Sequence, residues 1–210
     1  MEEWLATTGG RVAVLIIGAL FIAVVANMVL RRRRETEWES LARDLGLTFL
    51  VDDSGPRVTG TLNNRTIELS LVAESSDGGS GVAETQIRVG LAGVPEGMVA
   101  EATPDVWSGV VNQSLEAVQT GNEEFDQNVL LTGVDAATAQ AYWTEARQQT
   151  FLSLVRHQEE YDQLTVQSGN LTARFREVLS DHIRLESVIR HLVETAAALE
   201  AGSLSQNGVS

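Results

Sequence analysis

Oxygen-bearing side chains gather in one short segment of the chain, residues 122–128. The segment contains the side chains of Asn122, Glu123, Glu124, Asp126 and Asn128. Carboxylate and carboxamide oxygens at close spacing are ligands that Ca²⁺ and Mg²⁺ take in proteins, and the candidate metal ligands are Asn122, Glu124 and Asp126. No EF-hand spacing is present, so we favour a turn that leads into a strand, with Asp126 accepting hydrogen bonds from backbone N–H groups.

Other residue patterns that support catalysis are weak. The chain has no cysteine, which excludes disulfides, thiol catalysis and iron–sulfur clusters. The chain has three histidines, and His182 and His191 on the last predicted helix do not closely share a face. Each of these two and His157 is interpreted as a solvated side chain near a helix terminus rather than a metal ligand. There is no G-x-S-x-G elbow, and residues 78–81 are not a phosphate-binding loop. The sequence therefore favours a non-enzymatic protein without a cofactor.

An uncharged, mostly apolar segment at residues 12–30 predicts a transmembrane helix. Nineteen residues at about 1.5 Å each span roughly 28 Å, close to the hydrocarbon thickness of a bilayer. The segment is followed by a basic cluster of Arg31, Arg32, Arg33 and Arg34. Arginine clusters remain on the cytoplasmic side, so we expect a single-pass cell-membrane protein with its N-terminus outside and residues 35–210 in the cytoplasm. Trp4 would lie at the outer interface, and the alternative of a cleaved signal peptide is disfavoured because the charge lies on the wrong flank.

Small residues within this segment predict a contact with another helix. The predicted partner-helix face consists of Gly18, Ala19, Ala23, Ala26 and Asn27. Small side chains allow two helices to approach closely, and an asparagine can hydrogen-bond across the contact. The alternative is a lipid-facing surface. The expected partners are the lipid bilayer and either a membrane protein or a second copy of the chain.

The charge of the chain is strongly negative. The formal net charge is −14, and all 15 basic residues are arginine. Residues 1–34 hold five arginines and two glutamates, a charge of +3, so residues 35–210 carry −17. Such a charge disfavours nucleic acid as a partner. It is typical of salt-adapted proteins, although a genome that prefers arginine to lysine would also give the absence of lysine.

The remaining sequence predicts one α+β domain. A helix at 35–46 has the apolar spacing of Trp38, Leu41, Ala42 and Leu45, and Asp135 would cap a long helix of about 22 residues. Ser180 or Asp181 would cap a last helix, whereas residues 103–119 are ambiguous. The expected strands are 47–51, 57–62, 66–73, 84–91, 98–102, 128–132, 164–167 and 171–175. Turns are expected at Asn63-Asn64 and at 168–170, and Trp38, Trp107 and Trp143 are expected in the core.

The expected fold is a single N-terminal transmembrane helix followed by one soluble domain of antiparallel hairpins packed with two or three longer helices. Five regions follow from this division. They are a short extracytoplasmic N-terminus (1–10), the transmembrane helix (11–30), a basic stop (31–35), the acidic α+β domain (36–201) and a disordered tail (202–210).

The segment from Gly121 to Gly133 resembles a motif of uncharacterised prokaryotic membrane-anchored proteins. The motif reads Gly-Asp-x-x-Phe-Asp followed by alternating hydrophobic residues and glycine, and Gly121, Phe125, Asp126 and Gly133 match it. Asn122 stands where the motif has aspartate. The Trp-x-x-Leu-Ala helix that starts at Trp38 resembles the start of the same proteins. The resemblance implies a similar arrangement over most of residues 36–200 and no known activity.

Two functions from different classes remain open. The first is a membrane-anchored, non-enzymatic interaction module or accessory subunit of a membrane protein complex, with a cytoplasmic acidic domain. The second is a membrane-tethered, divalent-metal-dependent enzyme or sensor that uses the acidic segment 122–128.

Overall fold

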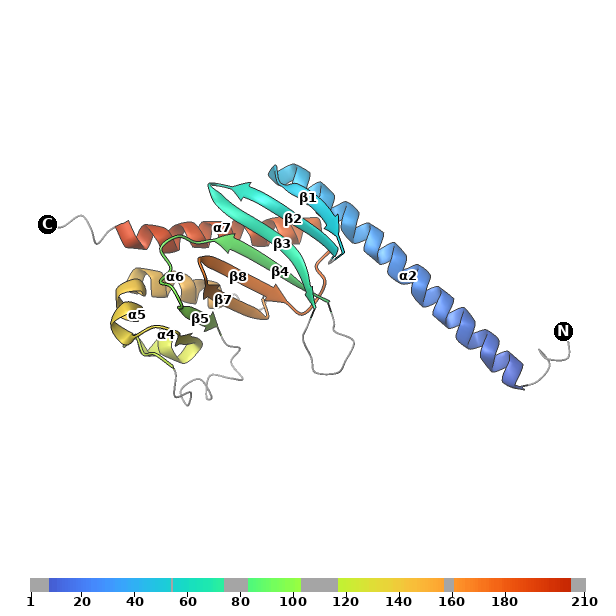
Figure 1. The fold of residues 1–210 in the computed structure, drawn as a ribbon, viewed down its shortest axis with the longest axis horizontal. Helices are drawn as coiled ribbons and strands as arrows, with labels where there is room; N and C mark the ends of the chain where they lie inside the picture. Colours follow the sequence, from blue (N-terminus) through green and yellow to red (C-terminus); the bar gives the residue numbers. More distant parts are fainter. Residues whose placement is uncertain (1–7, 54, 74–82, 103–116, 157–160, 205–210) are drawn as a thin grey trace.

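A computed structural model of the chain describes residues 8–53, 55–73, 83–102, 117–156 and 161–204. Within these ranges the strands form one antiparallel sheet in the order β1-β2-β3-β4-β8-β7-β5-β6 (Figure 1). The strands are β1 (Thr48–Asp52), β2 (Gly55–Leu62), β3 (Arg65–Ala73), β4 (Ala83–Gly90), β5 (Val99–Ala102), β6 (Val129–Thr132), β7 (Gln163–Gln167) and β8 (Asn170–Phe175). The helices are α2 (Thr8–Leu45), α4 (Glu123–Asn128), α5 (Ala136–Tyr142), α6 (Glu145–Val155) and α7 (His182–Leu204). The predicted α+β class with antiparallel hairpins is therefore confirmed.

Tight turns set the register of the hairpins. Asn63 and Asn64 have positive φ angles of 51° and 66°, and Leu62 pairs with Arg65 across the turn. Two consecutive left-handed residues match the twist of antiparallel strands, and asparagine tolerates that conformation better than most residues. Ser168 and Gly169 form the same kind of turn between β7 and β8. Both predicted turns are confirmed.

The core lies between the sheet and the helices. Alternate residues of the central strands, such as Val58, Leu69 and Ile87, are completely buried on the face that α7 covers. In Figure 1, α7 lies behind the sheet and the C-terminal part of α2 lies along its β1–β2 side. The predicted apolar spacing in α7 is confirmed by the buried Leu185, Val188, Ile189, Leu192, Ala196 and Leu199. The predicted core positions of α2, Trp38, Leu41, Ala42 and Leu45, are also buried.

The predicted membrane span is wrong. In the described part of the chain, no helix has both the length and the apolar composition that a membrane crossing requires. The prediction made residues 11–30 a separate membrane-spanning unit, whereas α2 runs through the arginines to Leu45 as one helix (Figure 1). Its second half is charged and packs on the domain, so the apolar segment is part of a longer mixed helix. The transmembrane part of the expected fold, the single-pass description and the cell-membrane location are corrected accordingly.

Two local predictions also differ from the structure. The single long helix after Asp135 is divided into α5 and α6, because the Thr144 hydroxyl accepts a hydrogen bond from the Arg147 N–H and starts a second helix. Asp135 caps α5 as predicted, with its carboxylate accepting from the Thr138 N–H at 2.7 Å. The segment 122–128 forms the short helix α4 rather than a simple turn before β6.

Several predictions concern residues outside the described ranges. These are Trp4 at the outer interface, the loop 74–81, Trp107 and most of the ambiguous segment 103–119, His157, and the end of the predicted tail from 205 onward. The first residues of that tail, 202–204, belong to α7.

Candidate functional site

The polar segment 122–128 is organised by its first residue. The Asn122 side-chain oxygen accepts from the Phe125 N–H at 3.2 Å and so caps α4, while its amide donates to the Gln148 oxygen at 2.8 Å. Glu123 and Glu124 lie in the first turn, where a negative charge interacts favourably with the helix dipole. These acids stabilise a helix start, which explains their density without a ligand.

Asp126 is buried and uses both carboxylate oxygens within the protein. One oxygen accepts from the Thr120 N–H at 2.9 Å and from the Thr120 hydroxyl at 2.8 Å, and the other accepts from the Gly121 N–H at 3.0 Å. Backbone N–H groups that face a carboxylate satisfy its charge and hold the preceding loop. This is the role that we favoured from the sequence.

The three candidate metal ligands face different partners. Glu124 lies at the surface and forms an ion pair with Arg156. The Asp126 carboxylate instead accepts hydrogen bonds from Thr120 and Gly121. Over the described ranges, no cluster of three or more histidine, aspartate or glutamate side chains is close enough to hold a metal ion. Asn122, Glu124 and Asp126 thus act in a cap, a surface ion pair and a loop anchor.

His182 links the two long helices. Its Nε2 atom lies 3.2 Å from an Asp44 oxygen of α2 and 3.8 Å from a Glu186 oxygen of its own helix. The side chain is half-buried, whereas the sequence predicts a solvated histidine. The burial arises because the C-terminus of α2 meets the N-terminus of α7, which the local sequence does not show.

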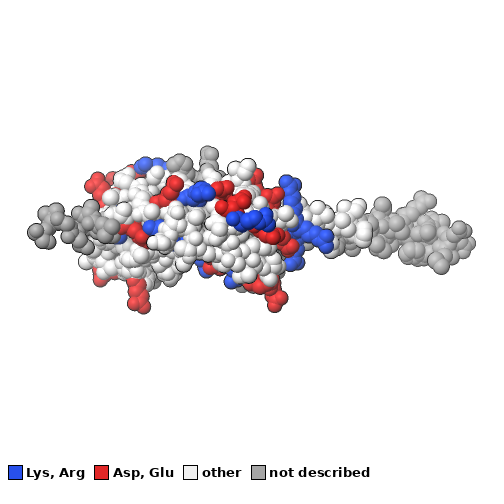
Figure 2. Space-filling view, turned by 90° about the horizontal axis from the view of Figure 1, so that it is seen from above, with Lys and Arg blue, Asp and Glu red and all other residues white. Residues whose placement is uncertain are grey.

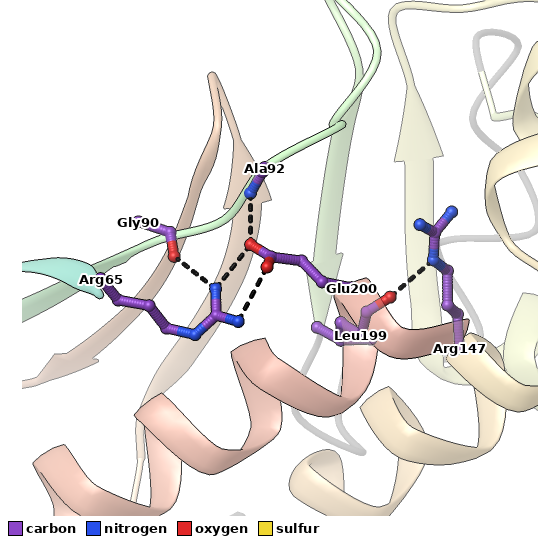
Figure 3. Close-up of polar contacts among 6 residues, drawn as sticks. All are labelled: Arg65, Gly90, Ala92, Arg147, Leu199 and Glu200. Atoms are coloured by element: carbon purple, nitrogen blue, oxygen red, sulfur yellow. Dashed lines mark hydrogen bonds and ion pairs between the residues drawn. The ribbon is translucent and has the colours of Figure 1, made fainter. Parts of the chain in front are cut away.

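A polar cluster that sequence analysis missed joins the sheet to the end of α7. Figure 3 shows the Arg65 guanidinium facing the Glu200 carboxylate, with donor–acceptor distances of 2.5 and 2.8 Å. The carboxylate also accepts from the Ala92 N–H at 2.6 Å. Hydrogen bonds from Arg65 and Ala92 lower the pKa of Glu200. The cluster fastens β3 and the segment after β4 to the helix that covers them.

A buried arginine continues this junction toward α6. The Arg147 Nε atom donates to the Leu199 carbonyl at 2.7 Å, as Figure 3 shows, and a terminal nitrogen donates to the Tyr142 carbonyl at 2.7 Å. Its guanidinium carbon lies 4.1 Å from the centre of the Tyr142 ring. Burial raises the pKa of Tyr142 to about 12, so the phenol stays neutral at physiological pH. Arg147 and Tyr142 connect α5, α6 and α7, which is a structural task.

Large apolar side chains are exposed along the projecting part of α2. The exposed side chains are Phe21, Ile22, Val25, Met28, Val29 and Leu30, with exposed fractions between 43% and 70%. Phe21, Val25 and Met28 are spaced i, i+4, i+7, which places them on one helix face. Figure 1 shows this part of α2 extending beyond the sheet, and Figure 2 shows basic side chains where the helix leaves the charged domain. This is the most apolar exposed surface among the described side chains.

The four predicted anchor arginines lie at the base of this projection. Arg31, Arg32 and Arg33 are exposed, and Arg31 donates to Glu35 one turn later at 2.9 Å. Arg34 is half-buried, and burial lowers its pKa. The predicted partner-helix face, Gly18, Ala19, Ala23, Ala26 and Asn27, lies within α2. Its role in helix pairing stays a prediction.

Comparisons with known proteins identify a fold but not a family. No family model matches the chain, and no curated protein matches it. Among solved structures, the chain is similar to the crystal structure of the mycobacterial trehalose monomycolate transport factor A, TtfA. The match has a TM-score of 0.50 and 10% sequence identity, and it covers 82% of this chain and 93% of the other. At that identity the likeness shows a shared fold and nothing more.

Proposed function

We propose that the protein is a non-enzymatic interaction module that docks an apolar helix of a partner protein against α2. The carrying observation is the row of large apolar side chains on the projecting part of α2. Exposed contiguous apolar surface is costly in water and marks interaction sites in native proteins. A helix with apolar residues at i, i+4, i+7 pairs most readily with another amphipathic helix.

In this proposal the rest of the domain holds α2 in a fixed position. The last turns of α2 are fully packed in the core through Trp38 and Leu41, and His182 and Asp44 join α2 to α7. A rigidly held helix loses less conformational entropy when it binds. The similar solved structure is named a transport factor. From that name we take only the general role of an accessory factor, and we do not assign its substrate to this chain.

Photo-crosslinking in cells tests the proposal. A photoreactive amino acid at Val25 should give one discrete protein adduct, whereas the same residue at Arg43, exposed on the packed half of α2, should not. Replacing both Val25 and Met28 by glutamate should abolish the adduct seen from Phe21. A self-adduct would identify the partner as a second copy, and a different protein would identify an accessory role. Absence of any protein adduct from Val25 would contradict the proposal.

The metal-dependent alternative has less support. The carboxylate of Asp126 is occupied by two N–H groups and a hydroxyl, and Glu124 pairs with Arg156. A metal would have to replace these contacts.

A further inference from the structure

The sheet face that points away from the helices carries a polar cavity. It has a volume of about 380 Å³, within the range of small-molecule sites. Its lining comes from neighbouring strands and includes Gln86, Arg88, Glu101, Gln163, Thr172 and Arg174. Gln86 and Arg88 flank the core residue Ile87 along β4, so they lie on the face opposite the core. In Figure 1, where α7 lies behind the sheet, this face is turned toward the viewer. The cavity is thus separate from the apolar part of α2.

Arg174 lies at one end of this lining, and its guanidinium has no ion-pair partner among the residues that the structure describes. It lies between Gln86 of β4 and Gln163 of β7 in one row across the three strands. The other arginine of the lining, Arg88, lies 3.6 Å from the Glu68 carboxylate. In contrast, no carboxylate of the described residues lies within ion-pair distance of the Arg174 guanidinium. Its charge is available to a ligand.

Gln86 presents a second unmet requirement. The residue is only 2% exposed, and no donor of the described residues forms a hydrogen bond with its side-chain oxygen. Buried carbonyl oxygens are almost always paired, because an unpaired one loses its hydration without compensation. Gln86 and Arg174 lie directly opposite each other, so one place in the cavity lacks both a hydrogen-bond donor and an anion.

The charges of the lining leave one arginine for an anion. The lining has two arginines and one glutamate, and Arg88 is paired with Glu68, which lies outside the lining. The glutamate, Glu101, already accepts a hydrogen bond from the Gln163 amide at 2.6 Å. The hydroxyls of Thr165 and Thr172 lie in the same lining and can both donate and accept.

We propose that this cavity binds a small anion that also carries hydroxyl groups, such as a sugar acid or a sugar phosphate. Its oxyanion pairs with the Arg174 guanidinium, whose planar fork suits carboxylate and phosphate equally. One of its hydroxyls donates to the Gln86 oxygen. The threonine hydroxyls take the remaining hydrogen bonds, which explains a lining rich in amides and hydroxyls.

Isothermal titration calorimetry of the full chain tests the proposal. The probes are gluconate, glucose 6-phosphate, glucose and inorganic phosphate. Gluconate or glucose 6-phosphate should bind. The probe that binds more tightly shows whether the cavity prefers a carboxylate or a phosphate. Glucose lacks the charge and phosphate lacks the carbon-bound hydroxyls, so each should bind roughly tenfold more weakly or worse, since a charged hydrogen bond has about that effect.

Matched variants locate the binding. Arg174→Gln should weaken binding of the better probe by about tenfold or more. Arg176→Gln removes the same charge from an exposed position just beyond β8 and should leave the affinity unchanged. Gln86→Met keeps the side-chain length and removes the acceptor, so it should also weaken binding without lowering the melting temperature. The proposal is overturned if neither anion binds, if phosphate binds as tightly as glucose 6-phosphate, or if Arg174→Gln binds like the unmodified chain.

Discussion

The indole N–H of Trp38 donates to the backbone carbonyl of Leu179 at 2.9 Å, across 141 residues of chain. The Thr85 hydroxyl accepts from the N–H of the same Leu179 at 2.8 Å and donates to the Glu177 carbonyl at 2.9 Å. The segment before α7 is therefore held by α2 on one side and by β4 on the other. These contacts make the C-terminal part of α2 an integral element of the domain.

Replacing Trp38 by phenylalanine should reveal this contact. The variant loses the donor to Leu179, leaves a buried carbonyl unpaired, and creates a cavity, for a cost of about 2–4 kcal/mol. Trp143→Phe is the matched control, because Trp143 is equally buried but its indole N–H has no hydrogen-bond partner within the described ranges. Urea unfolding should show that Trp38→Phe is the more destabilising by about 1 kcal/mol. Equal losses would mean that the Leu179 hydrogen bond contributes nothing.

Glu200→Gln should destabilise the protein in a pH-dependent manner. The pKa of Glu200 is lowered by Arg65 and Ala92, so the ion pair stabilises the fold above the unfolded-state pKa of glutamate. That contribution is lost as the pH falls through the folded-state pKa. We expect a loss of about 1–2 kcal/mol at pH 7, shrinking below pH ~4.5.

Denaturant curves of Glu200→Gln and the unmodified chain at several pH values measure that gap. Glu194→Gln, an exposed position on the same helix, is the control and should behave like the unmodified chain throughout. A gap that is constant with pH would show that the carboxylate charge of Glu200 is not the source of the stabilisation.

Asp126→Asn should lower stability whether or not a divalent cation is present. Asparagine keeps one oxygen but brings an NH₂ group to face the Gly121 or Thr120 N–H, a loss of about 1–3 kcal/mol. Thermal melting with Ca²⁺, with Mg²⁺ and with a chelator measures this. A cation-dependent rise in the melting temperature that disappears in Asp126→Asn would instead favour the metal-dependent alternative.

The acidic surface predicts a response to salt. Added KCl screens repulsion among like charges, and the chain carries a net charge of −14. If the composition is a salt adaptation, the melting temperature should rise toward molar KCl. A flat response would leave a genome preference for arginine as the explanation for the lysine-free composition.

Local signals in the sequence predicted most of the domain's elements. The Asn63-Asn64 pair needs only its own backbone preference to form a turn. Asp181 accepts from the Arg184 N–H at 2.9 Å, so the last helix begins at one of the two predicted caps. The buried spacing of Trp38, Leu41 and Leu45 follows from helix periodicity, which the sequence displays directly.

Contacts between residues far apart in the chain could not be predicted from the sequence. Arg65 and Glu200 are 135 residues apart, and nothing near either residue indicates the pair. The cavity on the sheet depends on strand order, because Gln86 and Arg174 meet only when β4 lies beside β8. The span was mispredicted because residues 12–30 were treated as a helix in isolation, whereas their meaning depends on α2 continuing into the domain.

The continuity of α2 has a mechanical consequence. A helix of 38 residues is about 57 Å long and has no break between its projecting apolar turns and its packed end. It therefore fixes both the distance and the angle between a partner bound at Val25 and the sheet. Adding one residue near Arg33 would rotate the helix face that contains Val25 by about 100° relative to the domain. Adding seven residues would nearly restore the original orientation of that face. The geometry of any assembly would then depend on the number of residues between Val25 and the domain as well as on the side chains in contact.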